Sequence, residues 1–492
     1  MISEPQTREE TLDPEEWSDL RALGHRMVDD MFEYLETLRE RPVWQPMPDD
    51  VRQTFTTPLP QEGQPAGEVY EEFKQNVLAY PMGNIHPRFW GWVMGNGTPL
   101  GMLADMLAAG VNPNMGGGDH AGVQVELQVL NWCKQIFNYP ADASGLLVSG
   151  GSMANLLGLA VARTARAGYD VREEGVGASP ARLTMYGSVE MHSSLQRAVE
   201  VLGLGNNSLR RIPVDANHKI DLAALRLKIA EDIAAGMKPI CLIGNAGAVN
   251  TGAIDPLNDL ADIAAQHGMW YHVDGAFGAL AYLSPELRPL LAGMDRSDSL
   301  AFDLHKWIYL PFEAGCVLVR DREAHLRTFT LTPPYLVHAT RGLAGGDVWL
   351  SDYGIQLTRG FKALKVWMAL KTYGSQKYGR LIKQNVDQAS YLAEMVENSP
   401  CLELVAPVEL NVVCFRFTAP ELSSERLDSI NREILIRLQE SGAAVPSGTM
   451  VGGVYAIRCA ITNHRSRRED FEALVSDTVR IGEALLGEGW GS

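Results

Sequence analysis

The stretch SLAFDLHKWIYLPFEAGCVLVRD, residues 299–321, carries the pattern that decides the fold. Two β-rich runs, SLAFD at 299–303 and GCVLVRD at 315–321, flank a short segment that holds Lys306. Runs this apolar are typical of strands that are buried on both faces of a sheet. A desolvated lysine between them has a neutral amine that is nucleophilic toward carbonyl carbons. Taken alone, such a lysine is more often a surface residue whose stem packs on apolar neighbours.

Similar β-rich runs precede this stretch, and helical patterns separate them. They are LLVSG at 146–150, RLTMYGS at 182–188, PICLIGNAG at 239–247 and MWYHVDGA at 269–276. The alternation predicts an α/β domain with a mostly parallel sheet and crossover connections. After helical patterns near 360–373 and 380–398, the runs LELVAP, NVVCFRF and YAIRCAI alternate with helices at 424–440 and 468–487. This change predicts a smaller α+β domain.

The beginning of the chain follows a different pattern. Apolar residues recur three and four positions apart from Trp17 to Leu38, which predicts an amphipathic helix. Pro42, Pro46, Pro48, Pro58, Pro60 and Pro65 then predict an extended connector. We expect three parts: a helical arm with its proline-rich connector at 1–85, the α/β main domain at 86–375, and the small α+β domain at 376–492. The arm needs a surface to pack on, and a second subunit could supply it.

Composition limits the partners and the compartment. The 492 residues include 43 basic and 60 acidic side chains, a net charge of −17, which opposes binding to nucleic acid. The six cysteines are scattered without a CxxC pair, so neither a disulfide framework nor a structural zinc site is expected. The acidic N-terminus does not resemble a signal peptide, and no apolar run approaches 18 residues. We therefore expect a cytoplasmic protein without a membrane partner.

Common nucleotide and metal motifs are missing from the sequence. No GK dipeptide is present, which excludes a P-loop, and no HExxH occurs. Gly116, Gly118 and Ala121 form a GxGxxA, but the preceding residues do not form a convincing strand. Nucleotide chemistry is therefore not favoured.

The segment LLVSGGSMANLLGLAVAR, residues 146–163, predicts a strand, a glycine turn and a helix. The turn at Gly150 and Gly151 exposes the free N–H groups of the helix that Ser152 opens, and these can bind a phosphate. Two alternatives stay open at this point. The turn could be an ordinary one, or Gly150-x-Ser152-x-Ala154 could be the nucleophile elbow of a serine hydrolase.

The segment HVDGAFGA, residues 272–279, places two polar residues on one face of a strand. His272 and Asp274 are two positions apart, while Gly275 and Ala276 leave room for a flat group. A buried carboxylate needs a cationic or donor partner, because isolated burial costs several kcal/mol. Asp274 could instead cap a turn. A metal site with His272 lacks a third ligand, so no metal is expected.

Together these segments supply three attachments on successive β/α units. A phosphate cup at 150–152, a carboxylate at Asp274 and an amine at Lys306 are the groups that hold pyridoxal 5′-phosphate, through its phosphate, its ring nitrogen and its aldehyde. This combination favours the cofactor hypothesis over each single-motif alternative.

The same residues carry a resemblance to a known family. The chain resembles the group II pyridoxal-phosphate-dependent decarboxylases, the family of the aromatic-L-amino-acid decarboxylases, and more distantly the glutamate decarboxylases. The family's lysine signature is matched by Ser299, Leu300, Lys306, Trp307, Ile308, Phe312, Ala314, Val317 and Arg320. The segments HPRFWGW, MLADML, SGGSMAN, MHSSLQRA, TGAIDPL, HVDGA and TPPYL follow in the family's order, so the resemblance covers roughly residues 70–400. It implies the aspartate-aminotransferase-like fold type I.

The resemblance also implies roles for individual residues. His192 is similar to the histidine that stacks on the cofactor ring, and Tyr335, in a loop near 331–348, to the tyrosine that protonates the carbanion. The implied catalytic set is Lys306, His192, Tyr335 and Asp274. The implied cofactor-binding set is Gly150, Gly151, Ser152, His192, Asp274, Ala276, His305 and Lys306. The residues implied on the substrate side are Trp92, Val93 and Arg359.

The implied reaction is the decarboxylation of an L-amino acid to its amine and CO₂ in a homodimer whose active sites lie between subunits. An aromatic substrate is favoured by the resemblance. The alternatives are a non-aromatic substrate, an aldehyde synthase, against which Tyr335 and His192 argue, a serine hydrolase using Ser152, and a non-catalytic cofactor-binding protein. The chain departs from the family at Ala248, Val249, Val93, Thr358 and Asp303. An acidic Asp303 would repel a phosphate unless it is turned away or bonded to a donor.

Overall fold

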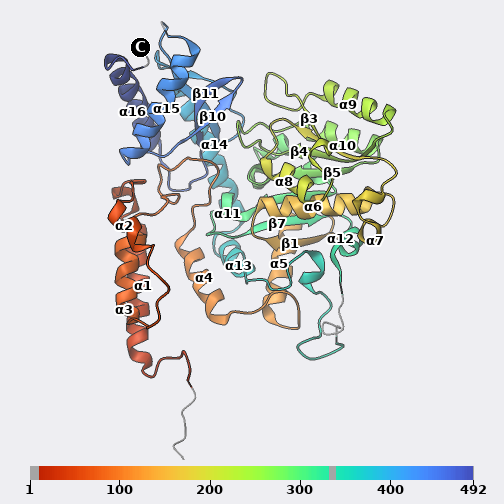
Figure 1. Cartoon of the computed structure of the whole chain (residues 1–492), viewed down its shortest axis with the longest axis horizontal. Coiled ribbons are helices and arrows are strands. Elements are labelled where there is room, and N and C mark those ends of the chain that lie inside the picture. The colour runs from red at the N-terminus through yellow and green to blue at the C-terminus, as the bar shows by residue number, and fades with distance from the viewer. Residues whose placement is uncertain (1–9, 332–338, 421, 491–492) are drawn as a thin grey trace, which may run out of the picture.

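The structure is a computed structural model of the chain, and it describes residues 10–331, 339–420 and 422–490. Its main sheet has seven strands in the order β1-β7-β6-β5-β4-β2-β3 (Figure 1). Their bounds are β1 (Ser144–Val148), β2 (Leu183–Ser188), β3 (Leu209–Ile212), β4 (Lys238–Asn245), β5 (Trp270–Asp274), β6 (Ser299–Asp303) and β7 (Gly315–Val319).

Four of the six pairings in this sheet are parallel. Strands β3, β2, β4, β5 and β6 run in one direction, and β7 is antiparallel to both β6 and β1. The predicted α/β class with a mostly parallel sheet is therefore confirmed. Strand β1 runs parallel to β6, because both are antiparallel to β7. The carboxyl ends of β1, β2, β4, β5 and β6 consequently lie at the same edge of the sheet.

Helices cover this sheet and complete its core. Their bounds are α4 (Pro99–Val111), α5 (Ala121–Ile136), α6 (Gly151–Arg166), α7 (Val171–Glu174), α8 (Ser193–Val201), α9 (Leu222–Ala234), α10 (Leu257–Gln266), α11 (Leu304–Trp307), α12 (Arg322–Phe329) and α13 (Ala363–Tyr373). Helix α6 packs across β4, β5, β6 and β7. Every residue of β5, β6 and β7 is buried, which explains why these strands read as continuous apolar runs. Strand β3 was not predicted, because its four residues include Arg210 and Arg211.

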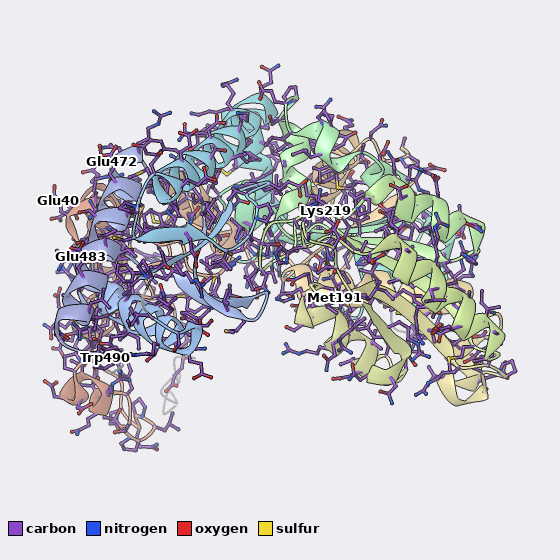
Figure 2. All side chains as sticks on the ribbon, turned by 90° about the horizontal axis from the view of Figure 1, so that it is seen from above. Glu40, Met191, Lys219, Glu472, Glu483 and Trp490 are labelled. Carbon is purple, nitrogen blue, oxygen red and sulfur yellow. The ribbon has the colours of Figure 1, made fainter. Side chains whose placement is uncertain are left out.

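A second sheet of four antiparallel strands, in the order β10-β11-β9-β8, forms the C-terminal part. Its elements are α14 (Ser375–Glu397), β8 (Leu402–Leu404), β9 (Val412–Phe417), α15 (Ser424–Glu440), β10 (Ser447–Val451), β11 (Val454–Ala460) and α16 (Arg468–Gly487). Strand β10 was not predicted, because its central three residues are at least partly exposed and carry little apolar pattern. Seen from above, the two parts form an arch, and Lys219 lies at their junction (Figure 2), where it pairs with Glu409 at 2.7 Å.

The N-terminal helices lie apart from the main sheet (Figure 1). They are α1 (Trp17–Glu36), α2 (Asp49–Thr54) and α3 (Ala66–Phe73). Helices α1 and α3 are joined where Asp30 accepts a hydrogen bond from the Tyr70 hydroxyl at 2.8 Å and pairs with Lys74 at 2.9 Å. The arm exposes the apolar side chains Trp17, Leu20, Phe55, Leu59, Val69, Phe73 and Val77. Of the helices described, none is both long enough and apolar enough to cross a membrane.

Candidate active site

The carboxyl edge of the main sheet gathers most of the predicted site residues. Strand β1 leads into Gly150 and Gly151, β5 ends at Asp274, and β6 ends at Asp303, three residues before Lys306. Polar groups at this edge are close to one another because parallel strands end there together. The edge is therefore where the predicted attachments meet.

The phosphate side of the site is built from small residues. Helix α6 begins at Gly151, and its N-cap, Gly150, supplies no side-chain cap. A Cβ atom added to Gly151 would lie 3.2 Å from the Ala276 Cβ atom, and one added to Gly315 would lie 2.4 Å from the Gly150 Cα atom. Backbones approach closely only because these positions are glycines. An anion can therefore reach the N–H groups that open this 16-residue helix.

His305 borders the same cup in a fixed tautomer. The Ala314 N–H donates to its Nδ1 atom at 3.2 Å, so the Nε2 atom carries the hydrogen. That Nε2 atom is 3.7 Å from Asp303 Oδ2. Burial lowers the pKa of His305, which favours the neutral ring.

Lys306 forms an ion pair within its own turn. Its Nζ atom lies 3.0 Å from Asp303 Oδ2, and its side chain is 18% exposed. The other oxygen, Asp303 Oδ1, is buried and accepts no hydrogen bond from the described residues. Asp303 is therefore bonded to a cation, the arrangement that the sequence required for an acid at this position.

The ring side of the site is a complete hydrogen-bond network. Asp274 accepts from Asn155 Nδ2 at 2.9 Å and from the Ala276 N–H at 3.1 Å. Asn155 Oδ1 accepts from His272 Nε2 at 2.9 Å, and His272 Nδ1 lies 2.8 Å from Ser299 Oγ. Burial raises the pKa of Asp274, and the charges of His192 and Lys306 oppose that shift. The hydrogen-bond donors to Asp274, the Asn155 amide and the Ala276 N–H, are both neutral.

His192 joins this network from the start of α8. Its Nδ1 atom accepts from the Ser194 N–H at 3.2 Å, and Ser194 Oγ also lies 2.8 Å away. Asn155 Nδ2 donates to Ser194 Oγ at 3.1 Å, so one amide links His192 to Asp274. Burial lowers the pKa of His192, while Asp274 raises it less strongly. A neutral imidazole beside the Asp274 carboxylate results.

The residues expected on the substrate side lie in two places. Trp92 is half-exposed, with a left-handed backbone (φ 52°), and Val93 is buried beside it. Arg458 Nη1 donates to the Trp92 carbonyl at 2.9 Å. Arg359 is buried, and its guanidinium pairs with Glu126 at 2.5 Å and donates to the Leu147 carbonyl at 2.8 Å. Arg359 therefore supports the strand that leads to the cup, and its contact with substrate stays a prediction.

The remaining predicted site residues are Tyr335 and Ser152. Tyr335 lies outside the described residues. Ser152 is exposed at the start of α6 and makes no hydrogen bond with a histidine in the described ranges, which disfavours the nucleophile elbow. Among the described residues, no group of three or more His, Cys, Asp or Glu could hold a metal ion.

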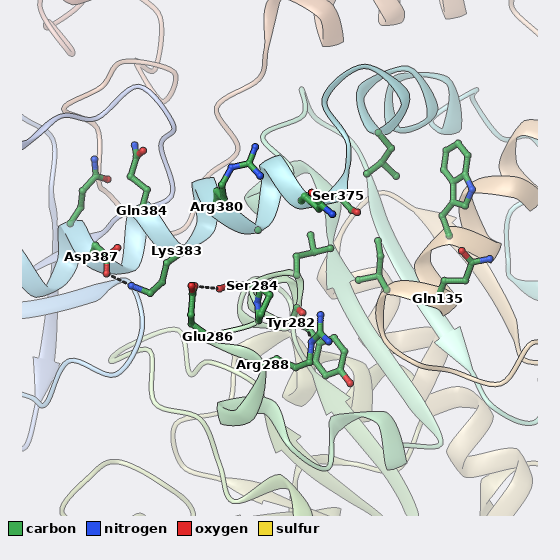
Figure 3. A pocket seen from close by; sticks show the side chains of 18 of the residues that line it. Gln135, Tyr282, Ser284, Glu286, Arg288, Ser375, Arg380, Lys383, Gln384 and Asp387 are labelled. Atoms are coloured by element: carbon green, nitrogen blue, oxygen red, sulfur yellow. Dashed lines mark hydrogen bonds and ion pairs between the residues drawn. The ribbon is translucent and has the colours of Figure 1, made fainter.

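A separate pocket lies away from this site. It has a volume of about 1280 Å³ and lies between α14 and residues 282–288. Figure 3 shows Arg380, Lys383 and Asp387 on the helix facing Tyr282 and Arg288 on the opposite segment. Its lining contains none of the predicted site residues, so chemistry rather than size locates the candidate active site.

The residues of the sheet edge fit pyridoxal 5′-phosphate. The glycine cradle, formed by Gly150 and Gly151 at the start of α6, leaves space for the phosphate. A Cβ atom at either position would fill part of that space. Asp274 offers a carboxylate held by neutral donors to the ring nitrogen, and Lys306 offers an amine for the aldehyde. Three attachments on three elements match the three polar ends of the cofactor.

Comparison with known proteins agrees with this geometry. The family model described as pyridoxal-dependent decarboxylase conserved domain matches residues 48–418. The chain belongs to the pyridoxal-dependent decarboxylase family. An aromatic-L-amino-acid decarboxylase of Bacillus atrophaeus is 35% identical over 475 residues, which cover 95% of this chain and 96% of that protein. A phenylacetaldehyde synthase of Arabidopsis thaliana is 29% identical over 462 residues, which cover 92% and 93%.

A solved structure of a pyridoxal-dependent decarboxylase is also similar to this chain. The Oryza sativa TDC with PLP and tryptamine superposes with a TM-score of 0.88 at 26% identity and covers 96% of this chain and 100% of that one. These findings confirm the predicted fold type I, pyridoxal phosphate as the cofactor and amino-acid decarboxylation as the reaction class. The serine-hydrolase hypothesis is excluded by the family.

The network behind Asp274 contains residues that the sequence did not single out. Asn155 and Ser194 lie in the segments SGGSMAN and MHSSLQRA, for which the sequence suggested no role at these two positions. Ser299 is a position of the lysine signature only. Asn155 follows Gly151 by one helical turn, and a carboxylate on a buried strand needs donors. This spacing was the one available signal for Asn155. Ser194 and Ser299 had no comparable signal.

Proposed function

We propose that this decarboxylase converts an aromatic L-amino acid to its amine and CO₂. The observation that carries the proposal is the convergence of Lys306, Asp274 and His192 at one edge of the sheet, beside the glycine cradle. When bound, pyridoxal phosphate supplies an electron sink for the pair that CO₂ leaves behind. The names of relatives such as the Bacillus protein support an aromatic substrate.

The proposed roles follow from the surroundings of each side chain. Lys306 would hold the aldehyde carbon of the cofactor, and Asp274 would keep the ring nitrogen protonated, because its charge is not cancelled by a neighbouring cation at bonding distance. His192, neutral and fixed by Ser194, would lie against the ring. Tyr335 would deliver the proton to Cα. Gly150, Gly151, Ser152, Ala276 and His305 would surround the phosphate.

On the substrate side we propose that Trp92 and Val93 contact the side chain of the amino acid. Trp92 supports this proposal because it is a large aromatic group that is half-exposed. We propose that Arg359 acts by positioning the cup through Glu126 and Leu147. A Trp92→Ala variant should then change the order of preference among aromatic substrates, which Arg359→Lys should leave unchanged.

The experiment is a screen of L-amino acids with the cofactor-loaded protein, following CO₂ and amine. Tryptophan, tyrosine and phenylalanine should give both products in equal amounts, while glutamate and 2,4-diaminobutyrate should give far less. Ser152→Ala distinguishes the two classes, because a hydrolase would lose its activity outright, whereas the decarboxylase should recover CO₂ release when the cofactor is saturating. Release of CO₂ only from the non-aromatic acids would refute the aromatic proposal.

The same screen distinguishes an aldehyde synthase, the activity named for the Arabidopsis relative. Such an enzyme consumes O₂ and water and releases aldehyde, ammonia and hydrogen peroxide with each CO₂. We expect no peroxide from this chain, because Tyr335 and His192 are both present. Peroxide in amounts equal to CO₂ would reverse this choice.

We further propose that the chain forms a homodimer with active sites between its subunits. The arm supports this proposal, because Trp17, Leu20 and Phe73 expose apolar surface that a second subunit could cover. Sedimentation should show a dimer, and the double variant W17S/L20S should weaken it. The matched control is Leu227→Ser, which changes an exposed apolar residue on α9. A monomer in the unmodified protein would contradict the proposal.

The division into residues 1–85, 86–375 and 376–492 stays a proposal, as does a cytoplasmic location. The six cysteines support the location, because each is a free thiol. Limited proteolysis near residue 85 and fractionation of cells that express the protein would test these two points.

A further inference from the structure

Asp303 lies where an anion is expected to bind. A Cβ atom added to Gly315 would be 2.8 Å from Asp303 Oδ1, and one added to Gly151 would be 3.1 Å from Asp303 Oδ2. Gly150 faces the same carboxylate, with a corresponding distance of 3.7 Å to Oδ1. Three glycines thus separate a buried acid from the start of α6, without a side chain between them. The acid and the phosphate of the cofactor would share this space.

The charged and titratable neighbours of Asp303 come from α11, from β7 and from the residue before α8. Lys306 of α11 is at 3.0 Å and His305 of α11 at 3.7 Å. His192, before α8, and the Cys316 thiol of β7 lie within electrostatic range. His305 cannot readily take a second proton, because its Nδ1 atom accepts the Ala314 N–H. Lys306 is therefore the cation that balances Asp303.

Attachment of the cofactor removes this balance. On attachment, the amine of Lys306 would attack the aldehyde carbon, a C=N bond would form, and the two amine hydrogens would leave with the aldehyde oxygen as water. The lysine must first lose its ammonium proton, and the nearest acceptor is Asp303 Oδ2. The phosphate meanwhile brings negative charge to the start of α6. Two anions that share one buried site cannot both stay ionised at low cost.

We propose that Asp303 takes the ammonium proton of Lys306 when the cofactor attaches, and keeps it as a neutral acid beside the phosphate. In the free protein Asp303 pairs with Lys306 at 3.0 Å. In the loaded protein its hydroxyl would donate to a phosphate oxygen. The transfer frees the lysine lone pair for attack and removes the repulsion between carboxylate and phosphate. This inference rests on the proposed roles of Lys306 and the cup.

The test is an infrared difference spectrum of the full chain, loaded minus free. A neutral carboxylic acid has a carbonyl band above the amide I band, and labelling with [4-¹³C]aspartate lowers its frequency. Wild type should show this band on addition of pyridoxal phosphate, and Asp303→Asn should not. The matched control, Asp298→Asn, removes a half-buried carboxylate that directly precedes β6, at the opposite end of the strand, and should keep the band.

A second measurement is the rate of cofactor attachment. The rate at which pyridoxal phosphate attaches to Lys306 can be followed by its absorbance, and the loss of an internal base should slow it roughly 100-fold in that variant. Cofactor attachment in wild type without a labelled acid band would overturn the inference, whatever the variant does. Failure of wild type to bind the cofactor would instead refute the proposed function.

Discussion

The two buried carboxylates of the site, Asp274 and Asp303, lie on neighbouring strands and are stabilised in opposite ways. Asp274 is bonded to neutral donors, the Asn155 amide and the Ala276 N–H. Asp303 is paired with the Lys306 cation and has one oxygen without a partner in the described structure. The hydrogen-bond network around Asp274 is complete, whereas Asp303 faces the glycines at the start of α6 with one oxygen that is unbonded among the described residues.

The difference shows how one site can hold both ends of a charged cofactor. Neutral donors stabilise a buried charge without cancelling it, so Asp274 can still attract a protonated ring nitrogen. An ion pair cancels the charge of Asp303, so an anion can approach. The hydrogen bonds of Asp274 can therefore stay in place when the cofactor binds, whereas Asp303 can exchange its Lys306 partner for the phosphate.

The largest effect should come from removing the cation of the phosphate side. Lys306→Ala deletes both the attachment of the cofactor and the partner of Asp303, so CO₂ release should fall by about 10³-fold or more. The assay is ¹⁴CO₂ release from a carboxyl-labelled substrate. Lys228→Ala, which changes a partly exposed lysine of α9 that pairs with Glu231, is the control and should leave CO₂ release unchanged. Residual activity within tenfold of wild type would show that Lys306 is not the attachment point.

A change on the ring side should be large without loss of the cofactor. Asp274→Asn keeps a polar group of similar size beside Asn155 but removes the charge, so activity should fall by roughly 10²-fold while pyridoxal phosphate stays bound. Cofactor absorbance and CO₂ release, measured on one sample, separate the two. Equal activity in the variant would mean that the ring nitrogen does not need this carboxylate.

The hydrogen-bond network around Asp274 includes the buried His272, so we expect the stability of the fold to depend on pH. Burial lowers the pKa of His272 to about 3, whereas an unfolded histidine has a pKa near 6.5. Between these values the unfolded chain binds the additional proton, so the free energy of unfolding decreases as the pH falls below 6.5. This residue alone should contribute about 1.4 kcal/mol per pH unit. His272→Gln should be less stable at pH 7 but should lose less stability on acidification, as urea unfolding at pH 6.5 and 5.5 would show. An unchanged slope would contradict the assignment.

The smallest effect should sharpen the role of the glycine cradle. A Cβ atom at Gly151 would be 3.1 Å from Asp303 Oδ2 and 3.2 Å from the Ala276 Cβ atom, so neighbours must move slightly. Crowding of about 1 kcal/mol would weaken pyridoxal phosphate about fivefold. A titration of absorbance measures this affinity. Gly24→Ala, whose Cβ atom meets nothing within 4 Å, should leave it unchanged. Tighter binding by Gly151→Ala would argue against a phosphate at this position.

Much of the fold could be predicted because buried parallel strands have a strong local pattern. All residues of β5, β6 and β7 are buried, so their apolar runs marked them in the sequence. Strands β3 and β10 were missed for the opposite reason, since each is partly exposed. A sheet edge relies on neighbours far along the chain, and a local pattern does not record them.

The sequence by itself determined the class of chemistry, because Lys306, Asp274 and the glycines at 150 and 151 occur in an order and a context that favour pyridoxal phosphate over each single-motif alternative. Only the tertiary structure decided how their charges are balanced. Asn155 lies 119 residues before Asp274, and Glu126 lies 233 residues before Arg359, yet both pairs are in contact. Hydrogen bonds depend on distance in space, so the different states of Asp274 and Asp303 follow from packing at the carboxyl edge of the sheet.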